Sequence, residues 1–256
     1  MRLIDTHCHL DIAAFDADRD EVVQQAKENG VESIIVPAID FVRWDNLLDI
    51  CSRYEGVYPA LGLHPVFIEE HKQKHLEALP KYIEQYKPIA VGEIGLDFFV
   101  KELDKEKQIE FVTQQLEIAK QFGLPVILHV RKAHAEMIKL LEQAKVKGGI
   151  CHAFNGDKAQ AYKYIDLNFK LGFGGMITYE RSVKLRKLAT ELPIESIVLE
   201  TDAPDMPVLQ HQGERNSPAY LPDVFETLSG LRKIKDALLE KELYLNSNKY
   251  LSFSLQ

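Results

Sequence analysis

The chain has 256 residues, of which 46% are hydrophobic and 27% are charged, as is usual for a soluble globular protein. Its formal net charge of −8 argues against a protein that coats nucleic acid through a broad basic surface. No apolar run approaches the ~20 residues of a membrane span. Asp5 and His7 lie where a signal peptide would have an apolar stretch, so the amino-terminal residues do not have the pattern of a signal peptide. We therefore expect a cytoplasmic protein with no membrane association.

Eight short runs rich in Val, Ile and Leu predict strands, and each is followed by a helical pattern. The predicted strands are Arg2–Asp5, Val31–Pro37, Val57–Leu63, Ile89–Val91 continuing to Asp97, Val126–Leu128, Gly149–Cys151, Phe169–Phe173 and Ile197–Leu199. The predicted helices are Asp18–Asn29, Trp44–Tyr54, Lys105–Phe122, Ala135–Lys145, Ala159–Asp166, Ser182–Glu191 and two that contain Leu228–Leu231 and Ala237–Leu245. The alternation predicts an α/β fold, a (β/α)8 TIM barrel that forms one domain over residues 1–256.

Two further segments lie between or after these elements. Glu69–Tyr86 is a polar segment in which His71 and His75, four residues apart beside lysines, are expected on a solvated face. Met206–Pro222, rich in Pro, Gly and polar residues, is expected to form a loop over the catalytic face. The three cysteines are too few and scattered for a disulfide framework, and we expect Cys8 and Cys151 to be buried and reduced.

Side chains that bind metals follow the predicted strands. His7 and His9 share one side of an extended segment, because alternate residues of a strand face the same way. Four more candidates lie at the ends of later apolar runs: Glu93, His129, His152 and Asp202. All strand carboxyl ends open onto one face of a barrel, so these six side chains are expected to converge there.

Six ligands are too many for one ion with an open position, but they suit two divalent ions. Glu93 would bridge them, since a carboxylate can span metals ~3.5–4 Å apart. We assign His7, His9 and Asp202 to the first ion, and His129 and His152 to the second. Mixed imidazole and carboxylate ligation suits Zn, Mn, Fe or Ni better than Ca, and Mg is also compatible.

The order and spacing of these motifs resemble the TatD family of metal-dependent deoxyribonucleases. The matching motifs are Asp5-Thr6-His7-Cys8-His9, Gly62-Leu63-His64-Pro65, Gly92-Glu93-Ile94-Gly95-Leu96-Asp97, Pro125-Val126-Ile127-Leu128-His129 and Glu200-Thr201-Asp202-Ala203-Pro204. The stretch from Asp202 to Pro207 is most similar to the YjjV subgroup. Many relatives in the wider superfamily bridge their metals with a carbamylated lysine, where this chain has Glu93.

The resemblance implies hydrolysis of DNA phosphodiester bonds, with a single strand or a strand end as the expected substrate and no obligatory protein partner. We expect attack by a metal-bound hydroxide, with Asp202 orienting or deprotonating the water and Glu93 holding the metals. His64 and Arg131 are predicted to bind substrate. The alternatives are an amide or carboxylic-ester hydrolase, including an aminoacyl-tRNA deacylase, and a metal-binding protein without turnover.

Overall fold

The computed structural model describes residues 1–251, and the side chains of residues 1–249. The last five residues of the predicted domain, 252–256, lie outside the described part of the chain. The strands are β1 (Leu3–Asp5), β2 (Val31–Pro37), β3 (Val57–Leu61), β4 (Ala90–Asp97), β5 (Val126–Arg131), β6 (Gly149–Cys151), β7 (Phe169–Phe173) and β8 (Ile197–Leu199). The helices are α1 (Arg19–Glu28), α2 (Trp44–Arg53), α3 (Gln73–Tyr86), α4 (Lys105–Phe122), α5 (His134–Ala144), α6 (Lys158–Asp166), α7 (Val183–Glu191), α8 (Leu221–Arg232) and α9 (Asp236–Leu251).

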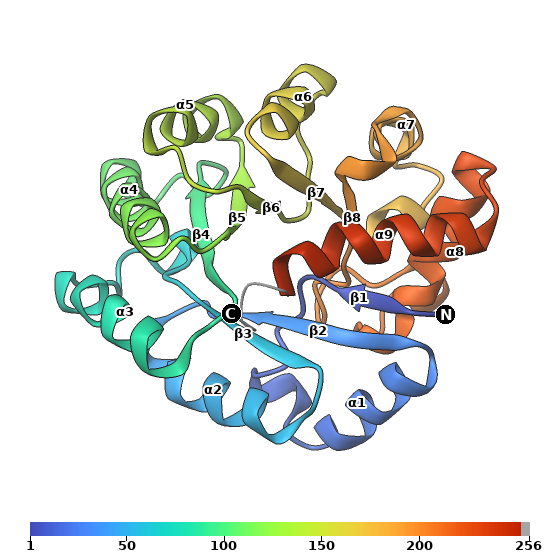
Figure 1. Ribbon diagram of the computed structural model, residues 1–256, viewed down its shortest axis with the longest axis horizontal. Coiled ribbons are helices and arrows are strands. Elements are labelled where there is room, and N and C mark those ends of the chain that lie inside the picture. The colour runs from blue at the N-terminus through green and yellow to red at the C-terminus, as the bar shows by residue number, and fades with distance from the viewer. Residues whose placement is uncertain (252–256) are drawn as a thin grey trace.

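The eight strands form one parallel sheet in chain order, and helices surround it (Figure 1). The sheet curls into a barrel whose seam lies between β8 and β1. At this seam Thr6 N donates to Leu199 O at 3.1 Å, and Cys8 forms a parallel bridge with Ala203. The predicted TIM barrel is therefore confirmed.

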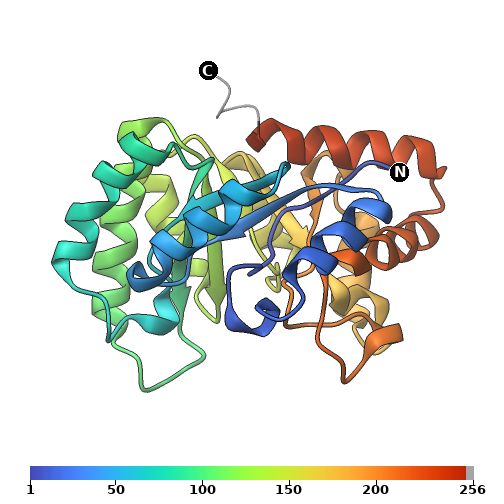
Figure 2. The same cartoon turned by 90° about the horizontal axis from the view of Figure 1, so that it is seen from below.

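The interior of the barrel is apolar at its amino-terminal end. Its buried side chains are Ile4, Ile35, Ala60, Ile89, Ala90 and Ile127. Helix α9 crosses this end of the barrel (Figures 1 and 2). Tyr244 of this helix packs against the cluster. The amino-terminal opening is thus covered, and the polar side chains gather at the opposite end.

Local sequence signals account for the best-predicted elements. Helix α4 has the predicted bounds because the Asp104 side chain accepts from the backbone N–H groups of Glu106 and Lys107, and because Gly123 ends the helix with φ of 63°. Cys8 and Cys151 are buried and unpaired, as expected. No helix within residues 1–251 is long and apolar enough to cross a membrane.

The polar segment Glu69–Tyr86 holds the helix that follows β3. Most of it forms α3, which buries Leu76, Leu79 and Ile83 although Pro80 interrupts its backbone hydrogen bonding. The expectation of a solvated face for His71 and His75 is wrong, since both side chains are buried. His71 contacts the His64 carbonyl, and His75 stacks on Phe41 with ring centroids 4.6 Å apart.

The loop predicted over Met206–Pro222 is broken by two 3₁₀ turns, Leu209–His211 and Pro218–Tyr220. Asn216 lies between them and is fully buried. Its side-chain amide donates to the carbonyls of Thr201 at 2.8 Å and Asp205 at 2.7 Å. These bonds tie the loop to the segment that carries Asp202.

Candidate metal centre

The structure brings all six predicted metal ligands to the carboxyl-terminal face of the barrel. Glu93 lies within β4 and His129 within β5. The other four follow the strands directly: His7 and His9 after β1, His152 after β6 and Asp202 after β8. The shared position comes from topology, because parallel strands deliver their carboxyl ends to one face.

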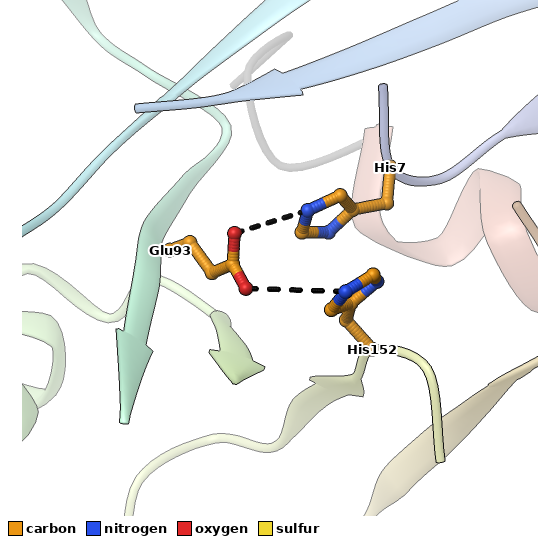
Figure 3. Close-up of side chains that lie close together, drawn as sticks. All are labelled: His7, Glu93 and His152. Atoms are coloured by element: carbon orange, nitrogen blue, oxygen red, sulfur yellow. Dashed lines mark ion pairs between the residues drawn. The ribbon is translucent and has the colours of Figure 1, made fainter. Parts of the chain in front are cut away.

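Glu93 lies at the centre of the group, with its side chain 1% exposed. Its Oε2 atom is 3.1 Å from His7 Nε2 and 3.6 Å from His9 Nε2. Its Oε1 atom is 3.0 Å from His129 Nδ1 and 4.0 Å from His152 Nε2. Figure 3 shows the two oxygens directed at different rings, one at His7 and the other at His152. Each oxygen of this carboxylate therefore faces imidazoles of its own, although the His7 and His152 rings stack with centroids 3.6 Å apart.

Asp202 closes the opposite side of the cluster. Its Oδ1 atom is 3.6 Å from His9 Nε2 and 3.8 Å from His7 Nε2, while its Oδ2 atom is 3.7 Å from His152 Nε2. The backbone of Asp202 is left-handed, with φ of 59°, and its N–H donates to the His7 carbonyl at 2.8 Å. A left-handed conformation is uncommon in a residue other than glycine, and such strain is concentrated at functional sites.

The donor atoms fit bound cations. The ligand-type atoms of His7, His9 and Asp202 all lie within 4.8 Å of one another, and so do those of His7, Glu93 and His152. Within the described residues, Glu93 Oε2 has no hydrogen-bond partner although it is buried. A buried carboxylate oxygen without a donor is costly, and a divalent cation between it and the imidazoles would remove that cost.

Burial and charge separate the histidine pKa values in the metal-free protein. Burial lowers the pKa of His7 well below its usual value and that of His9 to about 4. Burial also acts to lower the pKa of His152, but the carboxylates of Glu200 and Asp202 outweigh it and raise that pKa to about 10. His7 and His9 are thus neutral and ready to bind metal at pH 7, whereas His152 carries a proton.

Two buried carboxylates that the sequence analysis did not assign to the site contact the outer nitrogens of ligand rings. Asp97 Oδ2 is 3.0 Å from His129 Nε2, and Glu200 Oε1 is 3.2 Å from His152 Nδ1. The first is an aligned hydrogen bond, whereas the second is a close ionic contact. A carboxylate behind a ring holds the proton on the nitrogen that faces it, which leaves the other nitrogen free to bind metal. Both residues lie inside the quoted motifs, but only the fold shows which ring each one contacts.

Packing around Glu200 explains the glycine of β7. A Cβ atom on Gly172 would lie 2.1 Å from Glu200 Oε2, so any larger residue would displace this carboxylate. The Glu200 side chain is held from another side by the N–H of Ala153, which donates to Oε1 at 2.7 Å. Gly172 therefore makes room for the group that contacts His152.

A cavity of about 610 Å³ opens beside the cluster, and both predicted substrate contacts line it. Arg131 is 44% exposed, its Nη1 atom is 3.4 Å from Asp97 Oδ2, and its guanidinium lies 4.3 Å from the centre of the Phe99 ring. His64 follows β3 with Nε2 3.3 Å from Glu93 Oε1. Among the described residues that line the cavity, Arg131 alone carries a permanent positive charge.

A (β/α)8 barrel with clustered histidines and carboxylates on its carboxyl-terminal face defines a barrel hydrolase that depends on metal. The family model described as "TatD related DNase" matches residues 4–252. The chain therefore belongs to the TatD family and is a metal-dependent hydrolase.

Similar proteins agree with this assignment. The uncharacterized metal-dependent hydrolase YjjV of Escherichia coli is 41% identical over 91% of both chains. The uncharacterized metal-dependent hydrolase YabD of Bacillus subtilis is 32% identical over 91% of this chain and 92% of that one. The crystal structure of the E. coli TatD homologue YjjV superposes with a TM-score of 0.93, covering 96% of each chain at 39% identity.

Proposed function

We propose that the protein is a deoxyribonuclease that hydrolyses DNA phosphodiester bonds at a centre of two divalent ions, acting on single strands or strand ends. The proposal rests on the position of the Glu93 carboxylate, because its two oxygens face different imidazoles. A bridging carboxylate of this kind is the usual core of a two-metal hydrolytic site. The family description, which names a DNase, supports the choice of substrate.

The proposed ligand sets keep the division made from the sequence, in which the donor atoms of His7, His9 and Asp202 lie together and both His129 and His152 lie near Glu93 Oε1. His7, His9 and Asp202 hold the first ion, His129 and His152 hold the second, and Glu93 contacts both. Ions bound there would acidify water and polarise a phosphoryl oxygen. This donor set suits Zn, Mn, Fe or Ni, and also Mg at cellular concentrations.

Asp202 is the residue proposed to orient the attacking water and to accept its proton. Burial raises its pKa to about 7 in the metal-free protein, although protonated His152 opposes the shift. A carboxylate within reach of the attacking water can take up its proton during the reaction. Its position at the edge of the cavity gives it access to the water and to the substrate.

Arg131 and His64 are proposed to hold the substrate. Arg131 is held from behind by Asp97 and covered on one side by Phe99, which leaves its exposed face to bind an anionic oxygen. One cation in the cavity is enough for one phosphate group. It is too few for a long stretch of backbone, which agrees with a strand end as the substrate.

One observation favours a second candidate function, the hydrolysis of an amide or carboxylic ester. Much of the cavity wall is apolar, with Phe67, Phe173, Met176 and Ile177 among its lining residues. Such a wall would accept an acyl group as readily as a nucleobase. An activity panel on protein loaded with one defined metal separates the two, using short single-stranded DNA, duplex DNA, an aminoacyl-tRNA and simple amides and esters. Turnover of DNA alone supports the proposal, and turnover of carboxyl substrates alone overturns it.

Metal binding is expected to release protons, and hydrolysis is expected to fall on acidification. The pKa of His152 is about 10 in the metal-free protein, so its ring must lose a proton before Nε2 can bind an ion. Because this folded-state pKa lies above the unfolded value of ~6.5, protonation stabilises the metal-free fold fully below pH ~6.5, and this contribution is lost as the pH rises through about 10. Metal affinity should therefore rise with pH across the neutral range.

Calorimetric titration with Zn²⁺ at pH 7 in buffers of different ionisation enthalpy measures this release. We expect about one proton per chain from His152, and His152→Gln should lose that proton. An affinity that is constant between about pH 6 and pH 8, with no buffer-dependent heat, would contradict the assignment of His152 as a ligand.

A further inference from the structure

His64 differs from the proposed ligand histidines in what lies behind its ring. It is the N-cap residue of the 3₁₀ turn η3 (Pro65–Phe67), and its Nδ1 atom accepts a hydrogen bond from Val66 N at 3.1 Å. An imidazole nitrogen that accepts a hydrogen bond carries no proton. The neutral ring of His64 must therefore carry its proton on Nε2, the atom that faces the cluster.

Distance alone would make His64 a metal ligand. Donor atoms of His64, Glu93 and His129 lie within 4.8 Å of one another, as do those of His7, His9 and Asp202. The hydrogen bonds to their ring nitrogens distinguish His64 from His129. His129 Nε2 lies 3.0 Å from Asp97 Oδ2, so the proton of its neutral ring can stay there and leave Nδ1, which faces Glu93 Oε1 at 3.0 Å, to bind a metal, whereas Val66 N–H occupies the only lone pair of His64. His64 faces Glu93 Oε1 as a donor.

Several hydrogen bonds fix the turn that carries His64. A rotation of the ring that turned Nδ1 toward the cluster would therefore cost free energy. His64 N donates to Ile39 O at 3.0 Å, and the His71 ring contacts the His64 carbonyl at 2.9 Å. Gln115, buried on α4, accepts from Leu63 N at 2.8 Å and donates back to Leu63 O. Through these bonds the buried side chains of Gln115 and His71 hold the backbone on either side of the cap.

We propose that the cap of η3 locks His64 in the Nε2–H tautomer, so that it serves as a hydrogen-bond donor to an anionic substrate oxygen beside the metal centre and not as a metal ligand. The inference rests on the proposed function only for the presence of an anionic oxygen at the site. Glu93 Oε1 accepts this donor in the metal-free protein. Binding of ions by Glu93 would free the donor for substrate.

Two substitutions test the capping role of His64 Nδ1 and the donor role of His64 Nε2 separately. His64→Asn keeps an acceptor near the position of Nδ1, where it can still cap Val66 N, but places no donor near the position of Nε2. His64→Gln places an amide N–H near the position of Nε2 and cannot bind metal as an imidazole does. Metal content after loading with Zn²⁺, the affinity for inorganic phosphate, and thermal melts are measured for the full-length wild type and both variants.

Both variants are expected to keep the wild-type number of ions. His64→Asn should bind phosphate about tenfold or more weakly, as expected for the loss of a hydrogen bond to a charged group, and His64→Gln should stay within about threefold of wild type. Loss of an ion from either folded variant, or wild-type phosphate affinity in His64→Asn, would overturn the proposal.

The tautomer can be read directly by two-bond ¹H–¹⁵N correlation spectra of the full-length protein labelled with ¹⁵N-histidine, with the His64 signals identified by their absence in His64→Gln. We expect a protonated Nε2 and an unprotonated Nδ1 both before and after Zn²⁺ is added. Coordination of Zn²⁺ through Nε2 would overturn the inference. Failure to cleave DNA would remove the proposed function but leave these results able to decide the role of His64.

Discussion

Glu93→Ala is expected to lower kcat by at least about 10³-fold and to leave no more than one ion per chain. Two bound metal ions would together supply several kcal/mol of transition-state stabilisation, and each 1.36 kcal/mol corresponds to a factor of ten in rate. Glu93 makes the shortest carboxylate contacts to both imidazole groups, at 3.1 Å from His7 and 3.0 Å from His129. Its removal leaves clustered imidazoles without the central negative charge. Metal analysis and steady-state kinetics on short single-stranded DNA measure both effects.

Glu93→Gln is the matched variant, because it keeps the size of the side chain and removes only the charge. It should lose metal nearly as completely as alanine, while thermal melts show that both variants fold. If folded Glu93→Ala keeps two ions per chain, Glu93 is not the bridge and the division of ligands between the ions is wrong.

Asp202→Asn is expected to lower kcat by about 10²–10⁴-fold, or about 3–5 kcal/mol of barrier, with a smaller change in fold or substrate affinity. Asparagine keeps the shape of the side chain but cannot accept the proton of the attacking water. The left-handed backbone at this position favours the substitution, since asparagine adopts φ near 59° more readily than most residues. The loss should therefore appear in turnover and not in the melting temperature.

Asp205→Asn is the control for this variant. Asp205 lines the same cavity three residues later, is exposed, and donates its backbone N–H to Asp202 O at 2.9 Å. Removing its charge should keep most of the rate. If Asp202→Asn is folded, metal-loaded and within about threefold of wild type, the role given to Asp202 is wrong.

The sequence could predict the barrel and the meeting of the six ligand side chains because both follow from short-range patterns. Runs such as Val31–Pro37 are apolar enough for strands buried on both faces, and Asp104 and Gly123 mark the ends of α4. Once the strands are parallel and in order, the topology of a barrel brings His7, Glu93 and Asp202 together.

Contacts between distant segments could not be predicted in the same way. His71 and His75 sit among lysines, which suggested a solvated face, but His71 is buried where it reaches back to the His64 carbonyl. Asp97 and Glu200 were visible as acidic residues in motifs, but the ring that each contacts depends on the packing of neighbouring strands. The tautomer of His64 depends on a backbone N–H two residues away whose direction only the turn defines.

The central claim is that two ions lie on either side of the Glu93 carboxylate. Anomalous diffraction from crystals of the protein loaded with Zn²⁺ or Mn²⁺ tests it most directly. We expect two peaks ~3.5–4 Å apart, both bonded to Glu93. One should also be bonded to His7, His9 and Asp202, and the other to His129 and His152. A single peak, or a peak bonded to His64 Nε2, would contradict it.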